Sequence, residues 1–184
     1  VVAHPHPLHG GTMHNPVVFH ADRELHRKGM TTLRFNFRGV GESEGTHDEG
    51  DGERGDVAAA LAWVRGLAPG VPQAYVGYSF GSWCGYRHLI HDPAADAFVA
   101  IGLPANRYPF EEIGSLRVPM AVVQGSEDEF GTPDEVRAKL AGARPEARVH
   151  VVEGAPHLFP RMASDAAREV VAATLALLEL DGDA

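Results

Sequence analysis

The sequence predicts a single α/β domain over residues 1–184, with a mostly parallel, doubly wound sheet that carries helices on both faces. Short apolar runs rich in β-branched residues alternate along the chain with longer segments of helical periodicity, which is typical of βαβ units. Glycine and proline gather at the joints, for example at Gly10-Gly11 and between Pro69 and Pro72, and no repeat interrupts the series. These observations favour one doubly wound domain.

Each expected element follows from its residue pattern. The predicted strands are apolar runs at Val1–Ala3, Thr31–Phe37, Gln73–Tyr78, Ala97–Ile101, Met120–Gln124 and Arg148–Val152. The predicted helices are Val17–Lys28, Gly52–Leu67, Gly81–His91, Pro133–Leu140 and Ala163–Leu180. The last helix has an apolar stripe that would cover one face of a sheet. Right-handed crossovers place alternate helices on opposite faces, and ligands of such sheets bind beyond the carboxyl ends of the strands.

Charge and cysteine content restrict the partners and the compartment. The chain has 16 Lys and Arg against 25 Asp and Glu, a formal charge of −9, so it would repel nucleic acid and anionic membranes. Its single cysteine, Cys84, cannot form an intramolecular disulfide. With no signal peptide or bilayer-spanning run, a cytoplasmic location is expected. Val1 already lies in a strand-like run, so native residues are expected before it.

The segment Gly77-Tyr78-Ser79-Phe80-Gly81 has the spacing G-x-S-x-G between a predicted strand and a predicted helix. A serine in such a sharp turn is pushed outward at the helix N-terminus, and small flanking residues are needed to avoid collisions. The N–H of Phe80 would then face a developing oxyanion. Ser79 is therefore the candidate nucleophile, against the alternative of a serine that only caps the helix.

A serine hydroxyl needs a base, and in this motif an acid and then a histidine follow in the chain. Asp128 lies in the loop after the predicted strand Met120–Gln124, with Glu127 and Glu129 as rivals. His157 lies after the strand Arg148–Val152. Imidazole can accept the serine proton and return it to the leaving group while a carboxylate fixes its tautomer. The three residues follow successive strands in the required order.

Further residues are expected around this triad. Pro5 and Pro7 offer no N–H in the loop after the first strand, so the backbone N–H of His6 is the candidate second oxyanion donor beside Phe80. The segment 102–119 is too short for a cap domain and suggests a low aromatic rim. The candidate substrate-binding side chains are Tyr78, Trp83, Tyr108 and Phe110. A small-molecule acyl substrate and no cofactor are expected.

Two other functions fit parts of the sequence. His4-Pro5-His6 after a strand could be a metal-ligand pair, with His9 and His14 nearby, which would indicate a metal-dependent hydrolase. Later strands supply no convincing further ligands, and no metal is expected. A catalytically inactive binding module with the same fold is the third possibility, which labelling of Ser79 would exclude.

Together these motifs resemble the small α/β-hydrolase superfamily proteins that lack a cap domain and open with H-P-H-P-x-x-G-G-T-M. The resemblance covers nearly the whole chain and is carried by His4–Pro7 with Gly10–Met13, Leu33–Gly41, Gly77–Gly81 and Gly154–His157. It implies an α/β-hydrolase fold and a Ser-His-Asp hydrolase acting on small esters, thioesters or activated amides, similar to esterases and dienelactone hydrolases.

The sequence departs from this family in two places. The N-terminal hairpin that members generally carry is missing before Val1, which would expose a sheet edge and favour pairing in a homodimer. Pro156 and Leu158 replace acidic and aromatic neighbours of the histidine, so the loop around His157 is expected to differ in shape.

Overall fold

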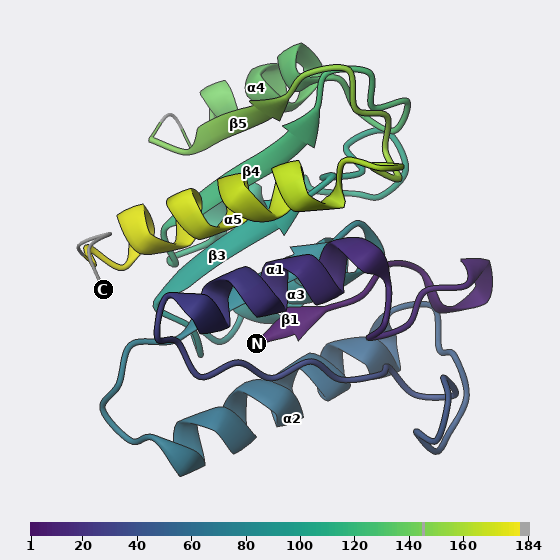
Figure 1. Cartoon of the computed structure of the whole chain (residues 1–184), viewed down its shortest axis with the longest axis vertical. Helices are drawn as coiled ribbons and strands as arrows, with labels where there is room; N and C mark the ends of the chain where they lie inside the picture. The colour runs from purple at the N-terminus through teal and green to yellow at the C-terminus, as the bar shows by residue number, and fades with distance from the viewer. Residues whose placement is uncertain (145, 181–184) are drawn as a thin grey trace.

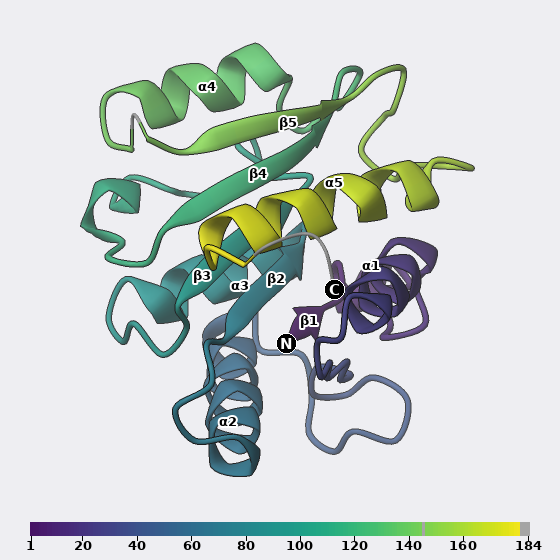
Figure 2. The ribbon, with the colours of Figure 1, turned by 60° about the vertical axis from the view of Figure 1, so that its left-hand side comes forward.

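The computed structural model describes residues 1–144 and 146–180, which form a parallel sheet between two layers of helices. Five strands stand side by side in chain order, and they fan out with the twist visible in Figure 2. The strands are β1 (Val2–Ala3), β2 (Ala74–Tyr78), β3 (Ala97–Ile101), β4 (Met120–Gly125) and β5 (Arg148–Val152). Each neighbouring pair is parallel, so all carboxyl ends meet at one edge.

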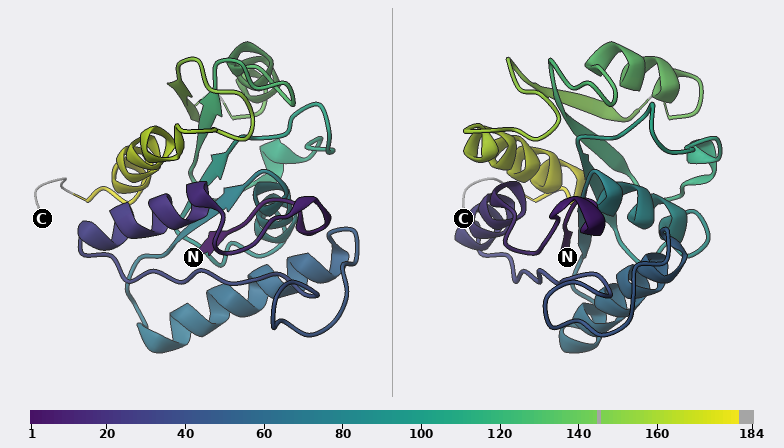
Figure 3. Two further views of the ribbon diagram at one scale, coloured as in Figure 1. Left: turned by 45° about the vertical axis from the view of Figure 1, so that its right-hand side comes forward. Right: turned by 90° about the vertical axis from the view of Figure 1, so that its right-hand side faces the viewer.

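The helices divide between the two faces of the sheet. They are α1 (Pro16–Arg27), α2 (Asp51–Leu67), α3 (Phe80–Leu89), α4 (Pro133–Ala141) and α5 (Ala163–Leu177), with short 3₁₀ turns η1 (Pro7–His9) and η2 (Ile113–Ser115). α1 and α5 pack against each other on one face (Figure 1), while α2, α3 and α4 lie on the other (Figure 3, right). The fold is thus the expected α/β type, with helices on both faces and no cap domain.

Local sequence explains where several helices begin. The Asn15 side chain accepts a hydrogen bond from the N–H of Val17 at 2.9 Å, and Pro16 occupies the first position of α1. At α4, Thr132 and Glu135 form a reciprocal capping box, in which the Glu135 carboxylate accepts from the Thr132 N–H at 2.8 Å. These caps satisfy N–H groups that have no partner within the helix.

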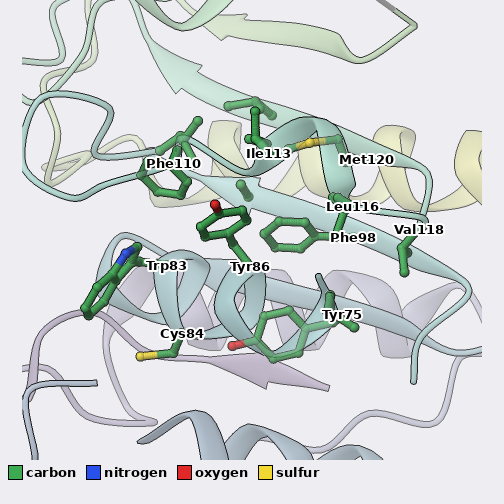
Figure 4. Packing of buried hydrophobic residues seen from close by; sticks show 14 of the residues in the cluster. Tyr75, Trp83, Cys84, Tyr86, Phe98, Phe110, Ile113, Leu116, Val118 and Met120 are labelled. Carbon is green, nitrogen blue, oxygen red and sulfur yellow. The ribbon is translucent and has the colours of Figure 1, made fainter. Parts of the chain in front are cut away.

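The core is continuous on both faces because the central strands are buried on each side. Tyr75 and Phe98 point to the layer of α2, α3 and α4, and Figure 4 shows them packed with residues of α3 and η2. Val76 and Val99, the next residues on the same strands, point to α1 and α5. This burial explains why these strands read as apolar runs rather than as alternating patterns.

The predicted strand Thr31–Phe37 is wrong. Only Arg34 forms a bridge, with Val2, and the N–H of Val2 donates to the carbonyl of Leu33 at 2.8 Å. β1 has two residues, so it offers too few backbone groups to pair with a whole strand. No other described segment pairs with the outer side of this run. An apolar β-branched pattern is therefore not sufficient for a strand when its neighbour is short.

Candidate active site

The serine of the G-x-S-x-G motif lies in the tight turn between β2 and α3, in a backbone conformation that non-glycine residues rarely adopt. Its φ is +53° and its ψ is −113°. A side chain at Gly77 would place a Cβ 2.6 Å from the backbone of Ser82, and one at Gly81 would place it 2.7 Å from the carbonyl oxygen of His4. The glycines therefore allow the helix to lie this close to β2 and to the loop after β1. The strained turn presents Ser79 at the carboxyl edge of the sheet.

The structure brings the three predicted polar residues into one hydrogen-bonded chain. Ser79 Oγ lies 2.8 Å from His157 Nε2, and His157 Nδ1 lies 2.9 and 3.0 Å from the two carboxylate oxygens of Asp128. His157 and Asp128 are each 1% exposed and Ser79 is 8% exposed. Because the carboxylate can only accept, Nδ1 carries the proton and Nε2 is left to accept from the hydroxyl.

The Asp128 carboxylate is itself fixed by two donors. The side-chain amide of Gln124 donates to Oδ2 at 2.9 Å, and the N–H of Phe130 donates to Oδ1 at 2.9 Å. Gln124 is buried at the end of β4 and also accepts from the N–H of Leu103 at 2.8 Å. Sequence reasoning missed Gln124. The available signal was a polar residue within a fully buried strand, directly before the loop of Asp128.

The rival acids have different places. Both glutamates are exposed, but Glu129 accepts from the backbone N–H of His157 at 3.1 Å, and neither contacts the ring nitrogens. Partial burial of Glu129 would raise its pKa, but backbone N–H donors, including that of His157, together with the nearby imidazole lower it below its usual value. Of the three acids in this loop, Asp128 is the one against Nδ1.

The loop after β1 crosses the start of α3. The rings of His6 and Phe80 lie 4.8 Å apart, and among the described residues neither backbone N–H donates to a backbone carbonyl. The expected oxyanion role of the His6 and Phe80 N–H groups stays a prediction. Gly11 permits the tight fold of this loop, since a Cβ there would lie 2.1 Å from the carbonyl oxygen of Pro5.

His4 is a buried structural histidine. Its Nδ1 lies 2.6 Å from the carbonyl oxygen of Pro5, to which it donates, and its Nε2 accepts from the N–H of Phe37 at 3.0 Å. Burial lowers its pKa to about 4, against a smaller opposing effect of the Pro5 carbonyl. Both ring nitrogens are thus occupied within the protein. In the described part of the chain, no cluster of three or more His, Cys, Asp or Glu is arranged to hold a metal ion.

The four predicted substrate-binding side chains lie at different depths. Tyr108 is half-buried and stacks on Trp83, with ring centroids 4.4 Å apart and an angle of 20° between planes. Phe110 is buried against Tyr86 (Figure 4). Tyr78 is fully buried, and its hydroxyl donates to the backbone carbonyl of His157 at 2.9 Å. Tyr108 therefore offers the most accessible of these four surfaces, and a substrate-binding role for the set stays a prediction.

Comparison with known proteins shows the family of this chain and two relatives. The model of a family described as "alpha/beta hydrolase domain" matches residues 2–178. A protein of Rickettsia prowazekii with no assigned function is 35% identical over 168 residues, which are 86% of this chain and 71% of that protein. A similar uncharacterized protein of Mycobacterium tuberculosis is 29% identical over 161 residues, and the match spans 57% of its length.

Solved structures with similar folds add detail. A serine hydrolase homologue from Coxiella burnetii is 32% identical with a TM-score of 0.86, and the match covers 93% of this chain and 82% of that one. A lidless α/β serine hydrolase from Xanthomonas campestris is also 32% identical, with a TM-score of 0.84 over 97% of this chain and 79% of that one.

No helix in the described residues is long and apolar enough to cross a membrane.

Proposed function

The chain belongs to the alpha/beta hydrolase family, and on this premise we propose that it is a serine hydrolase that cleaves small esters, thioesters or activated amides. The observation that carries the proposal is the buried hydrogen-bonded chain from Ser79 through His157 to Asp128. Its distances of 2.8 and 2.9 Å are those that proton transfer between the groups requires.

The proposed mechanism has two steps. Ser79 Oγ attacks the substrate carbonyl as its proton passes to Nε2 of His157, and the N–H groups of Phe80 and His6 hold the oxyanion. Collapse of this intermediate breaks the bond to the leaving group, which takes the proton from Nε2. A water molecule then attacks the acyl-enzyme with His157 again as base, which releases the acid and restores the serine hydroxyl. Asp128 remains ionised and stabilises the imidazolium.

The substrate class follows from the surroundings of Ser79. Among residues 1–144 and 146–180 no cap covers the site, since the segment 102–119 holds only the short turn η2. The half-buried ring of Tyr108 lies 6.1 Å from the buried ring of Phe80, next to the nucleophile in the chain, and offers an apolar wall for an acyl group. An open site with one aromatic side suits small acyl substrates better than long chains that need an enclosed tunnel. Cytoplasmic location and absence of a cofactor belong to the same proposal.

The deciding experiment is removal of the nucleophile. With p-nitrophenyl acetate as substrate, Ser79→Ala should lower kcat by about a thousandfold or more, and a fluorophosphonate probe should label the wild type but not this variant. Ser115→Ala, at an exposed serine on η2, is the matched control and should keep both properties. Hydrolysis retained by a folded Ser79→Ala protein would refute the proposal. Activity lost to a chelator instead would indicate the metal-dependent alternative, and an unlabelled, inert wild type the binding module.

A further inference from the structure

His157 has four groups that can form hydrogen bonds, and a different side chain contacts each of them. The ring is held at Nε2 by Ser79 and at Nδ1 by Asp128. The backbone is held at its carbonyl by the Tyr78 hydroxyl, at 2.9 Å, and at its N–H by the Glu129 carboxylate, at 3.1 Å. The four partners are two pairs of consecutive residues, one pair at the end of β2 and one in the loop after β4.

We propose that Tyr78 and Glu129 are positioning residues that hold the backbone of His157, so that its ring stays aligned between Ser79 and Asp128. This inference rests on the proposed function, and it gives Tyr78 a role other than substrate binding. It predicts that each of the two side chains affects turnover without touching the substrate.

Tyr78 is well placed for this role because it is adjacent to the nucleophile. Its ring packs among the apolar residues under α1 and α5, with the ring of Phe159 at 6.1 Å. Burial, and then the nearby carboxylates of Asp128 and Glu129, raise its pKa, so the hydroxyl stays protonated and donates over the working pH range. The end of β2 thus presents the nucleophile at Ser79 and, through the Tyr78 hydroxyl, holds the backbone of His157.

The loop after His157 shows why such a hold is needed. Phe159 and Arg161 both have positive φ values, +49° and +63°, which non-glycine residues rarely adopt. Such residues persist only where the surrounding structure fixes them. Leu158, between His157 and the first strained residue, is 66% exposed and so contributes little packing. The Tyr78 hydroxyl and the Glu129 carboxylate come from outside this loop. Their hydrogen bonds to the backbone of His157 fix the end of the loop that carries the catalytic ring.

Ring contacts complete the arrangement without replacing these bonds. The Phe130 ring lies 4.4 Å from that of His157, and the Tyr78 ring lies 6.0 Å from it. Such contacts limit the tilt of the ring, but they do not fix the position of the backbone along the loop. Misplacement by about 1 Å can cost a hundredfold in rate, so loss of a backbone hold should be measurable.

The first test removes one hydroxyl. Tyr78→Phe keeps the ring and its packing, and we expect kcat for p-nitrophenyl acetate to fall about 10- to 100-fold with KM within about twofold. Tyr86→Phe is the matched control, since this buried tyrosine accepts from the N–H of Glu112 outside the site. Tyr86→Phe should keep kcat even if its free energy of unfolding falls as much as that of Tyr78→Phe. A kcat for Tyr78→Phe within about twofold of wild type would overturn the role of Tyr78.

The second test separates a hydrogen bond from a charge. Glu129→Gln keeps an oxygen that can accept from the His157 N–H, whereas Glu129→Leu does not. We expect Gln to retain most of kcat and Leu to lose about tenfold, with Glu127→Leu in the same loop as a control that keeps activity. Equal kcat values in the Gln and Leu variants would overturn the role of Glu129.

A third measurement does not depend on turnover. Amide hydrogen exchange at His157 should accelerate at least tenfold in Glu129→Leu, and exchange in the following loop should accelerate in Tyr78→Phe. If the wild type neither hydrolyses esters nor reacts with fluorophosphonate, yet exchange accelerates as expected, the proposed function fails and the hold on His157 stands. If the wild type is active but exchange and kcat are unchanged in both variants, the hold fails alone.

Discussion

The proposed base side of the site, around His157 and Asp128, and the proposed oxyanion side, around His6 and Phe80, are assembled by different forces. On the base side, side-chain hydrogen bonds position His157 and Asp128, and a buried amide, Gln124, extends the network. On the oxyanion side, His6 and Phe80 are brought together by close backbone approaches, for which Gly81 leaves the space. The base side depends on polar side-chain atoms that form hydrogen bonds. The oxyanion side depends on a glycine whose missing Cβ lets two backbone segments approach each other.

This difference predicts opposite ways to damage the site. Deleting or changing a polar atom should disable the base side while the packing remains, at a cost in stability of about 1–3 kcal/mol for each buried partner left unpaired. Adding a single methyl group should disable the oxyanion side through displacement of backbone. The predictions below test this contrast from the largest expected effect to the smallest.

The largest effect is expected at the orienting acid. Asp128→Asn keeps the size of the side chain, but its amide can donate to Nδ1 and so favours the tautomer that cannot accept from Ser79. We expect kcat to fall about 10⁴-fold, as for loss of this charge in other triads, while stability falls by only about 1–3 kcal/mol and the protein stays folded. The measurement is kcat for p-nitrophenyl acetate beside an unfolding curve.

Glu127→Gln is the control for this change, since Glu127 is an exposed acid one residue earlier in the loop. It should keep kcat. A loss in Glu127→Gln as large as in Asp128→Asn would contradict the assignment of the acid and indicate a general effect of negative charge in the loop.

The second prediction adds a methyl group on the oxyanion side. In Gly81→Ala the new Cβ would lie 2.7 Å from the His4 carbonyl oxygen and 3.0 Å from that of Ala3, so rigid backbone must move. We expect kcat to fall by about 10²-fold or more and stability to fall by about 1–3 kcal/mol. Gly66→Ala in α2, where nothing lies within 4 Å of the added Cβ, should keep kcat and gain about 0.5–1 kcal/mol. Equal activity in the two variants would contradict the steric account.

Much of this arrangement was predictable because it is encoded locally. The turn at Ser79 follows from glycines at fixed spacing, and the order of Ser79, Asp128 and His157 after the strands β2, β4 and β5 predicted that they would meet. Asp128 was the predicted acid, with Glu127 and Glu129 as rivals, since the sequence does not show in which direction the loop points each carboxylate.

Contacts between distant segments were harder to predict. Tyr78 suggests an aromatic wall in the sequence, but its hydroxyl reaches a residue 79 positions away in the chain. Gln124 gave no motif signal at all. The predicted strand Thr31–Phe37 failed for a related reason, because a strand needs a partner of matching length, and pairing depends on the neighbouring segment rather than on the run itself.

The last expected effect is on stability alone, and it concerns pH and the buried histidine, His4, in the loop after β1. In the folded protein burial lowers the pKa of His4 to about 4, whereas an unfolded chain would protonate it near 6.5. The neutral form is thus favoured by folding. Its contribution to stability is fully present above pH 6.5 and is lost as the pH falls towards 4, by about 2–3 kcal/mol at pH 4.5.

His4→Gln isolates this contribution from the other groups that titrate in acid. Its side-chain oxygen can still accept from the N–H of Phe37, but it takes up no proton. We expect the free energy of unfolding in urea to fall between pH 7 and pH 4.5 by about 2–3 kcal/mol less in this variant than in the wild type. An identical fall in both proteins would mean that His4 does not stay neutral in the folded state. In that case the loop after β1 would not depend on an uncharged imidazole, and the loss of stability in acid would come from other titrating groups.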